Sequence, residues 1–326
     1  MKIAVIDDYQ DAFRKLSSFP KLKHHEVVVF SAPEKDPAKI AGQLNEVGAE
    51  ALVLTQQRTR IARGLIESLR TLKLISQTGA HTSHIDLAAC TERGILVSAG
   101  GGGNSSPTAE LTWGLIISAL RHIPYEADQL KHGRWQSTLG VGLKGRTLGI
   151  YAYGRIGSIV AGVGRAFGMK VVCWGREGSL KRAKDAGFEA APSCQAFFAT
   201  ADVLSLHLPL NAETRGIVTA QDLALMKPTS LLVNTSRAPL IAEGALVEAL
   251  RRGKPGFAAV DVFEDEPVLN IEDPLLKMDN ALCTPHLGYV IGENYESYYG
   301  TVIDQIVAFA AGKPINVANP EVLAKR

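Results

Sequence analysis

Short apolar runs alternate with segments of helical spacing through the N-terminal part of the chain. The runs have the length of buried strands, and the segments between them repeat apolar residues every three or four positions. Because strands that alternate with helices form parallel sheets, this pattern predicts a small doubly wound α/β domain. The predicted strands are 3–6, 26–30, 51–55, 72–77 and 95–98, and the predicted helices are 38–47, 61–69 and 85–92.

The same alternation resumes after residue 145 over a longer stretch. Two apolar runs, 147–152 and 170–174, flank a glycine-rich turn and a segment of helical spacing, which predicts a strand, a turn, a helix and a strand in succession. We therefore expect a second, larger doubly wound domain with a six-stranded parallel sheet. Its other four strands are predicted at 203–208, 230–235, 257–262 and 280–283.

A run of four glycines, 100–103, lies between the two patterns. Glycine is a poor component of a rigid element, so the run is typical of a hinge. The last predicted helix, 293–311, ends at Gly312. We expect this helix to pack on the first domain, because the six-stranded sheet is complete before the helix begins. The predicted domains are residues 1–103 with 293–326, and residues 104–292, with a ligand-binding cleft between them.

The turn after residues 147–152 carries two glycines of a dinucleotide-binding fingerprint. Its pattern is Ala-x-Gly-x-x-Gly, in which Gly154 and Gly157 are present and Ala152 replaces the first glycine. Gly154 would let the backbone approach a pyrophosphate, and Gly157 would let the following helix pack closely on the strand. The context predicts a Rossmann dinucleotide-binding domain; the alternative is a glycine-rich turn in an ordinary α/β unit.

The end of the next strand bears on the choice of cofactor. An NAD site usually places Asp or Glu there against the ribose 2′-hydroxyl, whereas this chain has Gly175 and Arg176. Without the carboxylate a 2′-phosphate is not repelled, and a guanidinium donates charge-assisted hydrogen bonds to it. We expect NAD(P)(H) and favour NADP(H). The alternatives are an NAD site that uses Glu177, and a solvated Arg176.

Composition narrows the class of protein. The chain has 326 residues, of which 46% are hydrophobic and 21% charged, with a formal net charge of +2, so nothing attracts it generally to nucleic acid or to an anionic membrane. The longest apolar window, 111–120, is too short to span a bilayer, and Met1 and Lys2 lead into a strand rather than a signal peptide. The four cysteines lack metal or disulfide spacing. We expect a cytoplasmic homodimer whose other partners are small molecules.

Three segments that follow predicted strands of the second domain carry reactive side chains. Ligands of open α/β sheets bind beyond the carboxyl ends of the strands, so these segments can converge on one site. An arginine can bind a carboxylate, and a histidine with a carboxylate partner can move a proton. Taken singly, each residue is more often a surface charge or a structural side chain. The segments are Asn234-Thr235-Ser236-Arg237, 261–267 and Thr284-Pro285-His286-Leu287-Gly288.

Two loops of the first domain also point to a ligand. The segment Thr78-Gly79-Ala80 follows a predicted strand and would offer backbone amides to a carboxylate. Arg58 lies in another post-strand loop and would bind a distal anionic group. We expect these four residues to contact the substrate, with solvated loops as the alternative. For the neighbouring Arg60 and His81 we favour the alternative, in which each is a solvated loop residue.

These motifs resemble, in order and spacing, the D-isomer-specific 2-hydroxyacid dehydrogenase family, which includes phosphoglycerate dehydrogenases and hydroxypyruvate reductases. The resemblance covers nearly the whole chain. It is carried by LGIYAYGRIG, SLHLPL, LLVNTSR, AVDVFEDEP and TPHLGY. It implies reversible hydride transfer between C4 of the nicotinamide and C2 of a D-2-hydroxy acid or 2-oxo acid. No metal is required, because a cation and a proton donor already meet the developing oxyanion.

The resemblance also implies roles position by position. Arg237 would grip the substrate carboxylate, protonated His286 would donate the proton, and Glu266 would hold the imidazolium. The implied cofactor contacts are Arg155 and Ile156 at the pyrophosphate, His207 and Leu208 at the adenosine, Asp261 at the carboxamide, and Thr235, Ser236 and Gly288 at the nicotinamide.

The chain departs from the family pattern at four positions: Ala152, Gly175, Ala238 and His81. Gly175 replaces the acid that would favour NAD, so a preference for NAD is in question. His81 replaces a glycine in the substrate loop, so the family pattern does not identify the substrate. Two other functions are consistent with the sequence. One is phosphoglycerate dehydrogenase within the same family, and the other is a non-catalytic nucleotide-sensing protein that resembles the corepressors of this fold. The Arg, Glu and His set favours catalysis.

Overall fold

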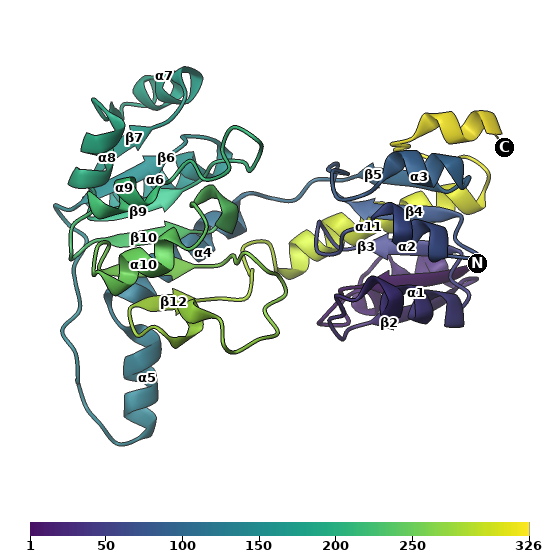
Figure 1. Ribbon diagram of the computed structural model, residues 1–326, viewed down its shortest axis with the longest axis horizontal. Coiled ribbons are helices and arrows are strands. Elements are labelled where there is room, and N and C mark those ends of the chain that lie inside the picture. Colours follow the sequence, from purple (N-terminus) through teal and green to yellow (C-terminus); the bar gives the residue numbers. More distant parts are fainter. Residues whose placement is uncertain (326) are drawn as a thin grey trace. The chain divides into compact units, whose positions relative to one another are not determined.

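The computed structural model describes residues 1–325 and divides the chain into two compact units (Figure 1). Unit 1 comprises Met1–Asn104 and Val290–Arg326, and unit 2 comprises Ser105–Tyr289. Each unit contains one sheet, of five and seven strands respectively, and every pairing between the named strands is parallel. The prediction of two doubly wound parallel sheets is confirmed.

The sheet of unit 1 has the strand order β2-β1-β3-β4-β5. Helices α1, α2 and α3 cover one face, where they pack on residues such as Ala4 and Leu52, while α11 covers the other face, where Ile3 and Val53 point. This alternation follows from the pleat of a strand, which sends successive side chains to opposite faces. The elements are β1 (Lys2–Ile6), β2 (Glu26–Phe30), α1 (Pro37–Glu46), β3 (Ala51–Leu54), α2 (Arg63–Ser68), β4 (Leu74–Thr78), α3 (Leu87–Glu92), β5 (Leu96–Gly100) and α11 (Gly292–Ala310).

Helix α11 supplies much of the core on its side of unit 1. Tyr299, Val302 and Ile306 are each at most 1% exposed. The glycine run also packs in this unit rather than standing free: a Cβ on Gly101 would lie 2.8 Å from Thr301 Oγ1 of α11. The glycines therefore let the chain approach the helix closely.

The sheet of unit 2 has the order β12-β11-β10-β9-β6-β7-β8. It contains seven strands and not the expected six, because the two-residue strand β8 (Glu189–Ala190) pairs with the outer edge of β7. A strand of that length is too short to show a periodic pattern. The other strands are β6 (Thr147–Tyr151), β7 (Lys170–Trp174), β9 (Val203–Leu206), β10 (Leu231–Asn234), β11 (Phe257–Val260) and β12 (Ala281–Cys283).

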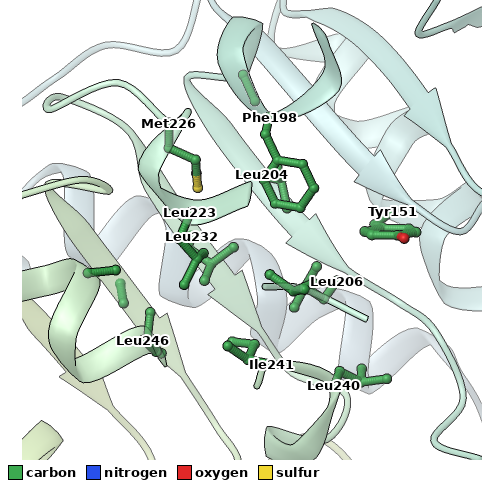
Figure 2. Packing of buried hydrophobic residues seen from close by; sticks show 14 of the residues in the cluster. Tyr151, Phe198, Leu204, Leu206, Leu223, Met226, Leu232, Leu240, Ile241 and Leu246 are labelled. Atoms are coloured by element: carbon green, nitrogen blue, oxygen red, sulfur yellow. The ribbon is translucent and has the colours of Figure 1, made fainter. Parts of the chain in front are cut away.

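Helices cover both faces of this second sheet. Leu204 of β9 and Leu232 of β10 belong to a cluster with α8, α9 and α10, which Figure 2 shows from close by. Their neighbours Val203 and Leu231 face α4 and α6 in a separate cluster. The helices are α4 (Ser106–Leu120), α5 (Ile123–Lys131), α6 (Arg155–Ala166), α7 (Glu177–Asp185), α8 (Cys194–Thr200), α9 (Ala220–Ala224) and α10 (Ala245–Arg251). Within residues 1–325, no helix is long and apolar enough to cross a membrane.

Candidate active site

The candidate residues of unit 2 gather at one edge of its sheet. Because all strands run parallel, the segments that follow them leave the sheet on the same side. Segment 261–266 follows β11, and segment 284–288 follows β12. Segment 235–237 follows β10, which lies between β11 and β9 in the sheet. Segments 152–157, 175–176 and 207–208 follow β6, β7 and β9. The strand order therefore places the reactive side chains on one half of this edge and the glycine-rich turn on the other.

The glycine-rich turn leads directly into a helix. Gly154 is the N-cap of α6, so the first amides of that helix face the sheet edge, where an anion is stabilised. A Cβ on Gly157 would lie 2.5 Å from the carbonyl oxygen of Ala152, so the helix can pack here only with glycine. Ala152 has φ +74°, the left-handed conformation that the missing glycine would adopt without strain.

A cavity of about 610 Å³ opens beside this turn, wholly within unit 2. Its walls come from the ends of β6, β7 and β9 and from the start of α7. Burial lowers the pKa of His207, in its wall, to about 4, and the Nε2 atom of that ring has no hydrogen-bond partner within the described residues. An unpaired buried nitrogen and a glycine cradle suit the adenosine and diphosphate of a dinucleotide. The lining includes Ala152, Gly154, Gly175, Arg176, His207 and Leu208.

The two predicted proton-transfer residues are in direct contact. His286 Nδ1 lies 2.6 Å from Glu266 Oε2, and both side chains are partly exposed, at 26% and 31%. His286 has φ +51°, in the left-handed region that favours glycine. With Nδ1 engaged, Nε2 of the ring is the atom available to a substrate.

The charge state of Glu266 follows from its neighbours. Burial alone would raise the pKa of this carboxyl, but the hydrogen bond and charge of His286, the Phe263 N–H and the charge of Arg237 together hold the pKa below its usual value. The carboxylate is therefore ionised at neutral pH, and it lies in hydrogen-bond contact with His286 Nδ1. The Arg237 charge is one cause of this lowered pKa, and Arg237 follows β10, the strand beside β11 in the sheet.

Asp261 anchors the loop that carries His286. Its Oδ1 accepts hydrogen bonds from Thr284 Oγ1 and from the Leu287 N–H, each at 2.7 Å, and its Oδ2 accepts one from the Gly288 N–H at 2.8 Å. Burial raises the pKa of Asp261, against the effect of these three hydrogen bonds and of the His286 charge. The aspartate, which is fully buried, thus fixes the chain on both sides of the histidine.

The segment after β10 is held in a similar way. Asn234 donates to the Arg237 carbonyl at 2.9 Å and accepts from the Ser236 N–H at 3.0 Å. Ser236 Oγ donates to the Leu208 carbonyl at 2.6 Å, which ties this segment to the end of β9. The Arg237 side chain is exposed, whereas Thr235 is buried against Thr112. A buried asparagine therefore presents the arginine at the sheet edge.

The substrate candidates of unit 1 lie at or just beyond the ends of its strands β3 and β4. Arg58 donates to the Asp7 carbonyl, and its guanidinium lies 4.6 Å from the centre of the Tyr9 ring. Thr78 is buried, and its hydroxyl donates to the Leu54 carbonyl at 3.0 Å. The Gly79 amide donates to Gly100, so it is engaged within the unit rather than offered to a carboxylate as expected. Ala80 and His81 are exposed.

Several residues of the cavity wall were not identified from the sequence. Ser179 and Arg182 lie three and six residues beyond Arg176, in the first and last turns of α7, and steps of three residues keep them on one side of a helix. Glu213 and Thr214 come from the turn that follows β9. Nothing in the sequence associates that turn with the end of β7.

The fold and this edge define a dehydrogenase that uses a nicotinamide nucleotide. A Rossmann sheet provides the cavity for the nucleotide, and an imidazole backed by a carboxylate stands with an arginine on the other half of the edge. A sequence profile of the "D-isomer specific 2-hydroxyacid dehydrogenase, NAD binding domain" matches residues 113–288.

Similar proteins extend this match to both units. The glyoxylate reductase of Aeropyrum pernix is 37% identical over 316 residues, which are 93% of this chain and 92% of that protein. The D-3-phosphoglycerate dehydrogenase of Methanocaldococcus jannaschii is 36% identical over 272 residues, 83% of this chain but 52% of that protein. A crystal structure of phosphoglycerate oxidoreductase from Vibrio cholerae o395 is 47% identical, with a TM-score of 0.91 over 96% of this chain and 99% of that one.

The chain belongs to the D-isomer-specific 2-hydroxyacid dehydrogenase family. It is an oxidoreductase that uses a nicotinamide cofactor and acts on the CH–OH group of 2-hydroxy acids. The predictions of the family, of the enzyme class and of NAD(P)(H) as the cofactor are confirmed.

Proposed function

We propose that the protein reduces a small 2-oxo acid to the D-2-hydroxy acid, and catalyses the reverse oxidation, with Arg237, Glu266 and His286 as its catalytic residues. The contact between His286 and Glu266, within reach of the Arg237 charge, carries this proposal. Glyoxylate, hydroxypyruvate and the phosphorylated 2-oxo acid of phosphoglycerate oxidation are the first substrates to test, since similar proteins are named glyoxylate reductase, hydroxypyruvate reductase and D-3-phosphoglycerate dehydrogenase.

The residues divide the chemistry between them. When bound, the nicotinamide supplies or accepts the hydride at C4. Arg237 binds the substrate carboxylate and polarises the C2 oxygen, His286 Nε2 donates the proton to that oxygen, and Glu266 stabilises the imidazolium before transfer. In oxidation the neutral imidazole takes the proton back. Substrate contacts in unit 1 are proposed for Arg58, Thr78 and Ala80, but not for the Gly79 amide, which donates to Gly100.

We propose further that the cofactor contacts are those implied by the family and that NADP(H) is preferred. Gly154, Arg155, Ile156 and Gly157 would bind the diphosphate, and Gly175 and Arg176 the modified ribose. His207 and Leu208, also in the cavity wall, would contact the adenosine. At the nicotinamide end the contacts would be Thr235, Ser236, Asp261 and Gly288. The positive start of α7 beside Arg176 supports the preference for the extra phosphate.

A screen of 2-oxo acids with NADH and NADPH tests the proposed function. We expect turnover of at least one of the three substrates, with NADPH used more efficiently than NADH. His286→Ala should lower the rate in both directions by roughly 10²- to 10⁴-fold, the usual effect of a positioned acid or base. Wild-type protein that binds cofactor yet turns over none of these acids in either direction would exclude this substrate class.

We propose a homodimer and a cytoplasmic location as the working state. Helix α5 and the segment after it project from unit 2 in Figure 1 and carry exposed apolar side chains, among them Trp135 at 76% and Leu139 at 94%. Such a surface is typical of an interface. All four cysteines are free, as in a reducing compartment. Sedimentation of the wild type and of Leu139→Ser tests the dimer, since only the wild type should sediment as two chains.

A further inference from the structure

An ion pair links two loops at the cavity of unit 2. Arg176, the N-cap of α7, donates a hydrogen bond from Nη2 to Oε2 of Glu213, which lies in the turn after β9. Both residues line the cavity, and both side chains are largely exposed, at 70% and 74%. The pair therefore joins the end of β7 to the turn after β9, beside the nucleotide cavity.

The turn that presents Glu213 is fixed by its neighbours. The Glu213 N–H donates to Asn211 Oδ1 at 2.9 Å, and the Thr214 N–H donates to the same oxygen at 3.0 Å. Thr214 is 3% exposed, and its hydroxyl donates to the Pro209 carbonyl at 2.6 Å. The backbone at residue 213 is thus held at the cavity wall, with the Glu213 side chain paired to Arg176.

The opposite wall is positively charged. Arg176 and Arg182 both line the cavity, and Arg182 is oriented by a 3.2 Å hydrogen bond to the Tyr153 carbonyl. Ser179, one turn into α7, accepts from the Tyr153 N–H at 2.7 Å. These cations and the start of the helix favour a phosphate, whereas β7 itself supplies no carboxylate for ribose hydroxyls because Gly175 occupies that position.

We propose that Glu213 sets the cofactor selectivity of this site. Its carboxylate replaces the missing acid at the end of β7 by accepting hydrogen bonds from the ribose hydroxyls of NAD(H). It also opposes NADP(H), because it pairs with Arg176 and repels the 2′-phosphate that Arg176 would bind. Arg176 thus creates a preference for the phosphorylated cofactor, and Glu213 limits it, so that both cofactors are accepted. This inference rests on the proposed nucleotide site.

Two adenosine nucleotides test the pair without any turnover. 2′,5′-ADP and 5′-AMP differ only in the 2′-phosphate, and calorimetry on the full chain gives the dissociation constant of each. Glu213→Gln should tighten 2′,5′-ADP by about two- to fivefold and should not tighten 5′-AMP. Arg176→Ala should weaken 2′,5′-ADP by about tenfold. When Arg176→Ala is already present, Glu213→Gln should have a smaller effect, because the carboxylate and the 2′-phosphate no longer compete for the Arg176 guanidinium.

Glu177→Gln is the matched control. It removes the same charge next to Arg176 in the chain, on an exposed residue outside the cavity wall. We expect it to change the ratio of the two constants less than Glu213→Gln does. An unchanged ratio in Glu213→Gln, or an equal shift in Glu177→Gln, would overturn the inference. The dissociation constants can be measured even if the protein reduces no 2-oxo acid. A failure of the proposed reaction is therefore distinguishable from a failure of this proposal.

Discussion

Two residues at the sheet edge of unit 2 adopt a left-handed backbone that favours glycine. They are Ala152, at the glycine-rich turn, and His286, the proposed acid/base. A side chain in this conformation costs about 1–2 kcal/mol relative to the right-handed region. At His286 the hydrogen bonds of Asp261 on either side hold the conformation in place. At Ala152 the close packing of α6 does so.

Ala152→Gly should therefore stabilise unit 2. Removing the strain outweighs the roughly 0.5–1 kcal/mol that glycine loses through its greater freedom in the unfolded chain, so we expect a gain of up to about 1 kcal/mol. Thermal unfolding should show a midpoint higher by about 2 °C. Ala161→Gly, inside helix α6, is the control and should lower the midpoint. A lower midpoint in Ala152→Gly would mean that its methyl group contributes more packing than strain.

The pairing of Glu266 with His286 predicts a pH dependence. Because the pKa of Glu266 lies below its usual value, the carboxylate stays charged through the neutral range, in contact with His286. Glu266→Gln removes this negative charge, so we expect reduction to lose its proton donor at lower pH than in the wild type. Oxidation, which needs the neutral ring, should become available at lower pH. Rates against pH in both directions measure this, and superimposable profiles would show that the pair has no part in proton transfer.

At the scale of elements, one buried aspartate fixes the loop after β12. Thr284→Val removes a single hydrogen bond to Asp261 with little change of shape, and the loop should hold His286 less tightly. We expect kcat to fall by about three- to tenfold with little change in the KM of the cofactor. Thr200→Val, which removes an exposed hydroxyl of α8 that donates to Ala196, should leave both constants unchanged.

Asp261→Asn extends this test. An amide nitrogen in place of one oxygen leaves either the part-buried N–H of Leu287 or the buried N–H of Gly288 without its acceptor, at a cost of about 1–3 kcal/mol. If the loop is the main role of Asp261, kcat falls further than in Thr284→Val. If the carboxamide of the cofactor is its main partner, the KM of the cofactor rises instead and Thr284→Val has no effect.

The sequence predicted the elements best where strands are buried on both faces. Residues such as Leu231 and Val233 are fully buried, so parallel strands appear in the sequence as uninterrupted apolar runs. Once the strands are located, the candidate site residues in the segments after them are located too. Short elements were missed, since β8 has too few residues for any period. Glu213 was missed for a different reason: it is 37 residues from Arg176, and only the folded sheet brings the two loops together.

At the scale of the whole molecule, each unit contains a half-buried histidine with ring nitrogens shielded from solvent, and each resists protonation. Burial lowers the pKa of His84 in unit 1 and of His207 in unit 2 to about 4. In the unfolded chain a histidine titrates near 6.5, so between these values the unfolded state binds more protons. The stability that the neutral rings provide is fully present above about pH 6.5 and is lost as the pH falls towards 4.

Urea unfolding at pH 7.5 and pH 5 should therefore show a loss on the order of 1 kcal/mol for each histidine at the lower pH. His84→Gln and His207→Gln should each reduce this loss, and the exposed His132→Gln should not. Equal losses in all four proteins would place the acid sensitivity elsewhere, for example in ionised carboxylates such as Glu266.

The split of unit 1 along the chain has a consequence for synthesis on the ribosome. Unit 2 is one continuous stretch, Ser105–Tyr289, whereas unit 1 needs both ends of the chain. The first sheet is translated first, yet Tyr299, Val302 and Ile306 of its core emerge only near the end. Nascent unit 2 is thus free to fold while the N-terminal strands still expose one apolar face. The growing chain would depend most on a chaperone during the interval between the synthesis of the first strands and the synthesis of α11.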